Sequence, residues 1–114
     1  MDAMTPRRAV ELVDALLPNQ YDEDQKLSWV YEAEGHVLAL LGRETGDLTE
    51  DTALTEPQPW DPLDRHYTEA QIHYCNGEME RYNNAMDLWN ALLLTWRDYT
   101  VRSGGGSVTA LKLC

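Results

Sequence analysis

Phenylalanine, cysteine and basic side chains are absent or scarce in this sequence. There is no Phe, only two Cys occur, and nine basic residues stand against twenty acidic ones. The formal net charge of -11 argues against a surface that binds nucleic-acid phosphates over much of the protein. The two cysteines, Cys75 and Cys114, allow one disulfide at most. Because Cys75 falls within an expected helix, we interpret both as reduced thiols.

Long apolar runs are also missing. No run approaches the roughly 18 apolar residues that a membrane span needs, and the opening MDAMTPRRAV lacks the apolar core of a secretory signal. We therefore expect a protein that stays in the cytoplasm and has no membrane partner. The 114 residues, 43% of them hydrophobic, predict one domain over 1–102 and a flexible tail over 103–114. Four Trp and six Tyr suit half-buried contacts with partners.

Apolar residues at helical spacing predict an all-α fold, a small bundle that begins with two shorter helices. Thr5 as N-cap and Pro6 at the first helical position begin a short helix, which Pro18 ends. Asp22, with a glutamine three residues later, resembles a capping box. It begins a second helix whose apolar spacing continues to Gly42.

The second half of the chain predicts a long acidic loop followed by one long C-terminal helix. The loop covers about 43–62, with a short strand pair at 46–54 as a possibility. The helix is expected from Pro62 to Arg102. Unbroken, it would span roughly 60 Å, more than a domain of this size can cover, so a break at Asn76-Gly77 is the alternative.

The expected long helix carries an unusual line of asparagines. Asn76, Asn83 and Asn90 recur every seven residues and fall within about 40° of one another on a helix. They border an apolar seam, where amides can fix the register between subunits or be bonded within one subunit. Leu88 and Leu94 point away from the seam, and an oligomer is the simplest cover for them. The candidate seam or oligomer contacts are Asn76, Tyr82, Asn83, Leu88, Trp89, Asn90 and Leu94.

Signals for chemistry are weak. Two Glu–His pairs at helical spacing, Glu32 with His36 and Glu69 with His73, could form a metal site if their helices faced each other. As surface pairs they would contribute only a few tenths of a kcal/mol each. No nucleophile motif, phosphate loop or zinc motif is present. We therefore predict no enzyme, no metal site and no cofactor.

Two short stretches point to a family. They are PNQY at Pro18–Tyr21 and NGEMERYNN at Asn76–Asn84. With the sequence around them, at 4–37 and 66–102, they resemble the small head-tail connector, or adaptor, proteins of long-tailed bacteriophages and prophages. Those proteins have a short helix, a PNxY turn, a helix with a central Trp, a variable acidic loop and a long helix. Their usual R-x-H-x-P ending is replaced here by VRSGGGSVTALKLC.

This resemblance implies a structural role in a virus particle. The chain would be one subunit of a ring, usually dodecameric, in the virion neck between the portal and the stopper or tail-completion proteins. It would be assembled in the host bacterial cytoplasm, and DNA would pass through an acidic channel without specific binding. In the tail, Val108, Leu111 and Leu113 are candidate portal contacts. The alternative is a small acidic helical interaction module, such as an inhibitor that mimics DNA.

Overall fold

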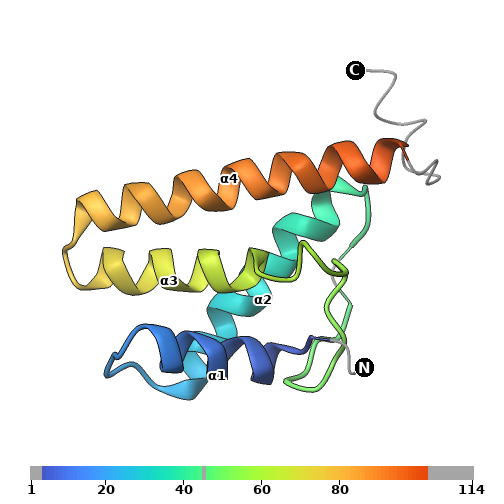
Figure 1. Cartoon of the computed structure of the whole chain (residues 1–114). Helices are drawn as coiled ribbons and strands as arrows, with labels where there is room; N and C mark the ends of the chain where they lie inside the picture. Colours follow the sequence, from blue (N-terminus) through green and yellow to red (C-terminus); the bar gives the residue numbers. More distant parts are fainter. Residues whose placement is uncertain (1–3, 45, 103–114) are drawn as a thin grey trace.

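Four helices form a compact bundle in the computed structural model, which describes residues 4–44 and 46–102. The helices are α1 (Pro6–Leu16), α2 (Glu23–Leu40), α3 (Leu63–Cys75) and α4 (Met79–Arg102). The all-α class is therefore confirmed. The helices α4, α3 and α1 form one row, and α2 crosses behind it and packs against α1 and α3 (Figure 1). None of the described helices is both long and apolar enough to cross a bilayer.

Both of the first two helices lie close to their predicted bounds. Thr5 caps α1 as expected, because its Oγ1 accepts a hydrogen bond from the Arg8 backbone N–H at 3.2 Å. The capping box expected at Asp22 is wrong, since its side chain makes no cap hydrogen bond. After α2, Gly42 adopts a left-handed φ of 70°, and the next backbone N–H reaches the Leu38 carbonyl at 3.0 Å. This Schellman-type end stops the helix at the glycine that the sequence indicated.

The expected single helix from Pro62 to Arg102 is wrong, and the alternative break at Asn76-Gly77 is present. Gly77 takes a left-handed φ of 78°, which a side chain would disfavour. Its backbone N–H bonds the Tyr74 carbonyl at 3.0 Å, and that of Glu78 bonds the His73 carbonyl at 2.9 Å. The reversal lets α4 pack back along α3 and bury an apolar face that a straight helix would leave in water.

The largest core cluster lies where α4 meets α2, α3 and the end of the loop. Trp89 and Trp96 supply the α4 side, and Trp60 of the loop packs beside Trp96 with ring centroids 5.6 Å apart. The other buried members are Ala33, Val37, Leu41, Leu63 and Tyr67. Two smaller clusters join α1 to the rest, so each helix has a buried face.

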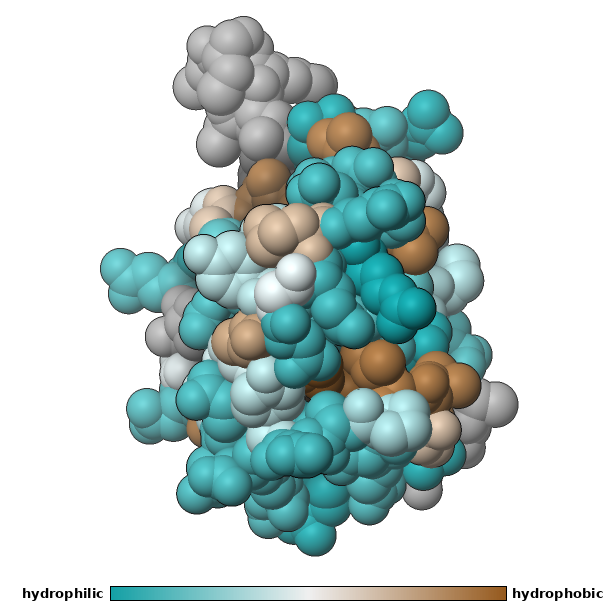
Figure 2. Space-filling view, turned by 90° about the vertical axis from the view of Figure 1, so that its left-hand side faces the viewer, coloured by the Kyte–Doolittle hydropathy of each residue, from teal (hydrophilic) through white to brown (hydrophobic). Residues whose placement is uncertain are grey.

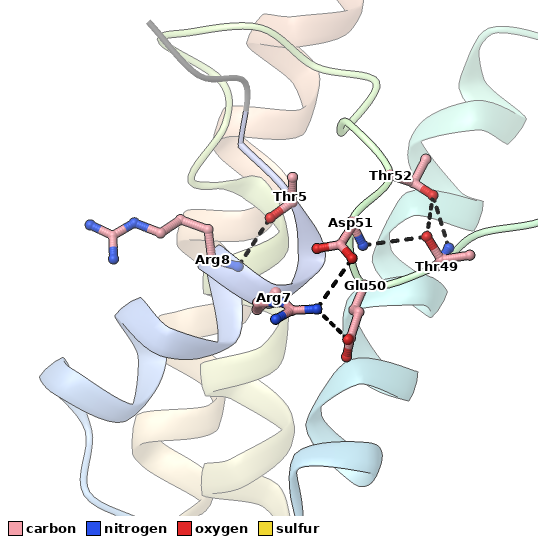
Figure 3. Close-up of polar contacts among 7 residues, drawn as sticks. All are labelled: Thr5, Arg7, Arg8, Thr49, Glu50, Asp51 and Thr52. Carbon is pink, nitrogen blue, oxygen red and sulfur yellow. Dashed lines mark hydrogen bonds and ion pairs between the residues drawn. The ribbon is translucent and has the colours of Figure 1, made fainter.

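The strand pair suggested for 46–54 is wrong: none of these described residues is in a strand. A turn stands there instead, in which the Thr49 backbone N–H donates to Thr52 Oγ1 at 2.9 Å and the Thr52 N–H donates to the Thr49 carbonyl at 3.1 Å. The hydroxyl groups of the two threonines are also 3.0 Å apart (Figure 3). Side-chain bonds of this kind compete with strand pairing.

This loop is fastened to the start of α1. The Arg7 guanidinium reaches toward the loop and binds the carboxylates of Glu50 and, at 3.2 Å, Asp51 (Figure 3). Two backbone bonds reinforce the contact, from the Arg7 N–H to the Glu50 carbonyl and from the Leu54 N–H to the Met4 carbonyl, both 2.9 Å. The long acidic segment therefore has a defined path across the molecule.

Candidate functional site

The helix α4 has two faces of opposite exposure. Trp89 is 4% exposed in the core, whereas its neighbour Leu88 is 57% exposed. Leu94 is 49% exposed, Ala91 between them is exposed as well, and the three residues span about 120° of the helix surface. This helix lies at the edge of the row, with α3 on one side of it (Figure 1). We name Leu88, Ala91 and Leu94 the outer α4 patch, and it contains both leucines predicted as contacts.

The predicted asparagine line does not exist, because the chain reverses within it. Asn76 ends α3, while Asn83 and Asn90 lie exposed on α4. The Asn76 side chain instead accepts a hydrogen bond from the Tyr21 hydroxyl at 2.6 Å and donates to Glu78 at 3.4 Å. The Asn76 amide is therefore hydrogen-bonded within one subunit, which was one of the two interpretations of the line; the other was contact between subunits.

The PNQY stretch is held by a buried lysine. Lys26 is 5% exposed, and its Nζ lies 2.7 Å from Asp14 Oδ1 and 3.1 Å from Asn19 Oδ1. Asn19 Oδ1 also accepts the Tyr21 backbone N–H at 3.1 Å. Since Tyr21 in turn binds Asn76, the two stretches that carry the family resemblance touch each other. The end of the molecule that carries these turns is mostly hydrophilic, with a few separate hydrophobic patches (Figure 2).

The two aromatic candidates, Trp89 and Tyr82, differ in burial. Trp89 packs against Tyr67, with ring centroids 5.1 Å apart, and is a core residue. Tyr82 is half-buried beside Tyr74, 5.2 Å between centroids. Of the two roles predicted for Trp89, oligomer contact or helix-seam contact, its place in the core follows the second, since its ring is covered within the chain. The candidate portal contacts Val108, Leu111 and Leu113 lie outside the described residues.

The two Glu–His pairs do not converge on a shared site. Glu32 accepts a hydrogen bond from the Tyr67 hydroxyl at 2.9 Å, and His36 packs beside aromatic rings. His73 lies 2.9 Å from Glu78 across the α3–α4 turn. This hydrogen bond is the main cause that lowers the pKa of Glu78. Both histidines therefore serve local contacts.

A different group of acids, not singled out by the sequence, meets inside the molecule. Glu34 comes from α2, Glu56 from the loop and Asp64 from the first turn of α3, and none is more than 2% exposed. One carboxylate oxygen of each lies within 4.8 Å of the others. The Thr55 backbone N–H donates to Glu34 at 2.9 Å and orients it. We name Glu34, Glu56 and Asp64 the acid cluster.

Burial sets the electrostatics of the acid cluster. It raises the pKa of Glu56 to about 10, helped by the hydrogen bond and charge of Glu34. Burial and the two neighbouring carboxylates raise the pKa of Asp64 well above its usual value. Burial also opposes ionisation of Glu34, but hydrogen bonds from Glu56, Asp64 and Thr55 outweigh it and lower the pKa. Glu34 is therefore the most easily ionised of the three, and Glu56 keeps its proton at neutral pH.

One sequence signal for this cluster was present. Glu34 stands four residues after Val30 and three before Val37, so it occupies the apolar stripe of α2. An acid at such a position must find a partner inside the protein. Asp64 lay near the start of the helix expected from Pro62, and Glu56 lay in the expected loop. The spacing of the three acids in the sequence did not predict that they lie together.

No protein-family model matches this chain, and no curated protein or solved structure matches it. Its function therefore has to be argued from its own residues.

Proposed function

We propose that this chain is a structural adaptor: one subunit of a ring, dodecameric in the adaptors it resembles, between the portal and the stopper or tail-completion proteins of a phage neck. The observation that carries the proposal is the outer α4 patch. A single exposed leucine is ordinary, but Leu88, Ala91 and Leu94 follow one another at three-residue intervals on an edge helix, and such a run of exposed apolar side chains suits contact with another macromolecule. The PNQY and NGEMERYNN stretches, which resemble those of phage adaptors, indicate that this assembly is a ring.

A cyclic ring needs two different surfaces on each subunit, because its contacts are head-to-tail. The second surface that we assign is a shallow groove between α1 and the start of α3. Leu16 is 61% exposed beside it, and Leu12 and Pro62 line it. Since α1 and α4 lie at opposite edges of the helix row (Figure 1), the α4 patch of one copy can enter the groove of the next.

The charge of the chain fits passage of DNA rather than its capture. A net charge of -11 per subunit, repeated around a ring, gives an acidic lining that repels phosphates. Tight non-specific binding of DNA depends on Lys and Arg contacts to phosphate, which this composition disfavours. DNA would therefore slide through the ring without sticking.

The test is to mix the purified chain with the portal protein encoded beside it and to measure co-sedimentation and stoichiometry. We expect a complex with as many copies of the chain as the portal ring has subunits. Leu88→Glu combined with Leu94→Glu should abolish this complex without unfolding the chain, because both side chains are exposed.

The matched control is Gln25→Glu combined with Ala53→Glu, which adds the same charge at exposed positions outside α4 and outside the two adaptor-like stretches. It should assemble normally. Assembly by the α4 double variant as well would remove the patch from the interface. Absence of any portal complex, with capture of a DNA-binding protein instead, would favour the DNA-mimic alternative.

A further inference from the structure

The acid cluster lacks the donors that buried carboxylates normally have. Apart from the carboxyl groups of the cluster itself, Glu34 Oε2 and both carboxylate oxygens of Glu56 and of Asp64 have no hydrogen-bond partner within the described chain. Among the ion pairs of residues 4–44 and 46–102, none involves these three acids. Acids on a surface are solvated by water, but these are sealed from it. Such orphaned groups are rare in native proteins and indicate a missing ion or proton.

The spacing of the oxygens matches one cation. Ca²⁺–oxygen bonds are about 2.3–2.6 Å long, so one ion can hold two oxygens up to about 4.8 Å apart and three equally spaced oxygens up to about 4.2 Å apart. The three candidate ligand oxygens lie within 4.8 Å of one another. We propose that Glu34, Glu56 and Asp64 bind one oxygen-preferring divalent cation, with Ca²⁺ preferred over Mg²⁺.

The chemistry of the site explains this preference. All three ligands are carboxylates, which suit Ca²⁺, Mg²⁺ and Mn²⁺ better than Zn²⁺, an ion that favours nitrogen and sulfur. Mg²⁺ gives up its water reluctantly, whereas the described site is closed to solvent. The first turn of α3, which holds Asp64, adds a partial positive charge that offsets the remaining negative one.

Binding would join three segments that are far apart in the chain. Glu56 would tie the loop to α2 through Glu34 and to α3 through Asp64. Glu56 also lines a groove between the loop and the start of α1, beside Thr5 and Arg7, although the residue is only 2% exposed. The cation would therefore stabilise the path of the loop as well as neutralise the acids.

The experiment is a calorimetric titration of the full chain, freed of metal by chelation, with Ca²⁺, Mn²⁺ and Mg²⁺ in turn. We expect one ion per chain and tighter binding of Ca²⁺ than of Mg²⁺. At a hundredfold excess over Kd, Ca²⁺ should raise the Tm by roughly 10 °C. The absence of binding and of any Tm change with all three ions would overturn the proposal.

Glu56→Gln and Glu80→Gln form a matched pair for locating the site. Each removes one negative charge, but Glu80 is exposed on α4 and far from the cluster in sequence. Glu56→Gln should lower the Ca²⁺ affinity about 100-fold while the chelated variant stays folded, because an amide resembles the protonated acid. Glu80→Gln should leave the affinity unchanged. Asp64→Asn offers an independent ligand removal on α3, and equal affinities in all variants would place the ion elsewhere and overturn the assignment.

Discussion

The acid cluster and the outer α4 patch are opposites. In the first, three acids are buried where apolar side chains are usual. In the second, Leu88 and Leu94 are about half exposed on a helix whose other face is in the core. Both depart from the rule that hydrophobic residues lie inside and charges outside, and departures of this kind concentrate at functional positions.

The two departures differ in what can relieve them. A buried carboxylate is relieved by something small, a proton or a cation, because its cost is that of an uncompensated charge. An exposed leucine is relieved only by a surface large enough to exclude water. One region therefore points to an ion and the other to a macromolecule, and each can be altered without the other.

The largest effect that we predict is a loss of stability with rising pH in the chelated protein. The raised pKa values of Glu56 and Asp64 mean that the folded state keeps protons which the unfolded state has released. Their stabilisation is complete below the unfolded pKa and is lost as the pH rises, for Glu56 from 4.5 to about 10. Each such proton costs about 1.4 kcal/mol of unfolding free energy per pH unit within the window.

Urea unfolding at about pH 7 and about pH 9 measures this loss. Burial lowers the pKa of His66 from 6.5, so most of the stability that His66 gains with rising pH is already reached at about pH 7, and its effect between the two pH values is small. In Glu56→Gln the free energy of unfolding should fall less steeply with pH, because one fewer proton is released on unfolding. A stability that stays level between the two pH values in the wild-type chain would contradict a buried acid cluster that holds protons.

The second prediction compares neighbours on α4. Trp89→Ala should lower the free energy of unfolding by about 3–5 kcal/mol, because it empties a core site. Leu88→Ala should change it by no more than about 0.5 kcal/mol in the isolated chain. Urea midpoints of both variants give the difference. If Leu88→Ala cost as much as the tryptophan, the outer patch would already be covered in the free protein.

Local signals predicted the helices, because each acts over a few residues. Thr5 and Pro6 marked the start of α1, and Gly42 marked the end of α2. The seven-residue spacing of the asparagines led to a wrong prediction of one continuous line, because periodicity carries no information about a chain reversal. The local sequence Asn76-Gly77 did indicate the reversal, because the left-handed conformation of Gly77 ends α3 within the periodic stretch.

The acid cluster could not be predicted because it is a tertiary feature. Its members stand at positions 34, 56 and 64 in two helices and a loop, and no local pattern relates them. Only Glu34 showed its burial in the sequence, through the apolar stripe of α2. The exposure of the outer α4 patch was predictable in contrast, since Leu88 and Leu94 point away from the apolar seam of their helix and so small a bundle cannot cover both sides.

The smallest effect expected concerns the outer fastening of the loop. Arg7 binds Glu50 and Asp51, but all three side chains are substantially exposed, and such ion pairs contribute less than about 1 kcal/mol each. Arg7→Met should therefore lower stability by about 1 kcal/mol or less, and added salt should remove most of the difference from wild type. The Ca²⁺ affinity of Arg7→Met should be unchanged, because Glu56 would still be held by the acid cluster. A large loss of both stability and affinity would mean that the loop is positioned from its surface, and that the acid cluster follows the loop instead of fixing it.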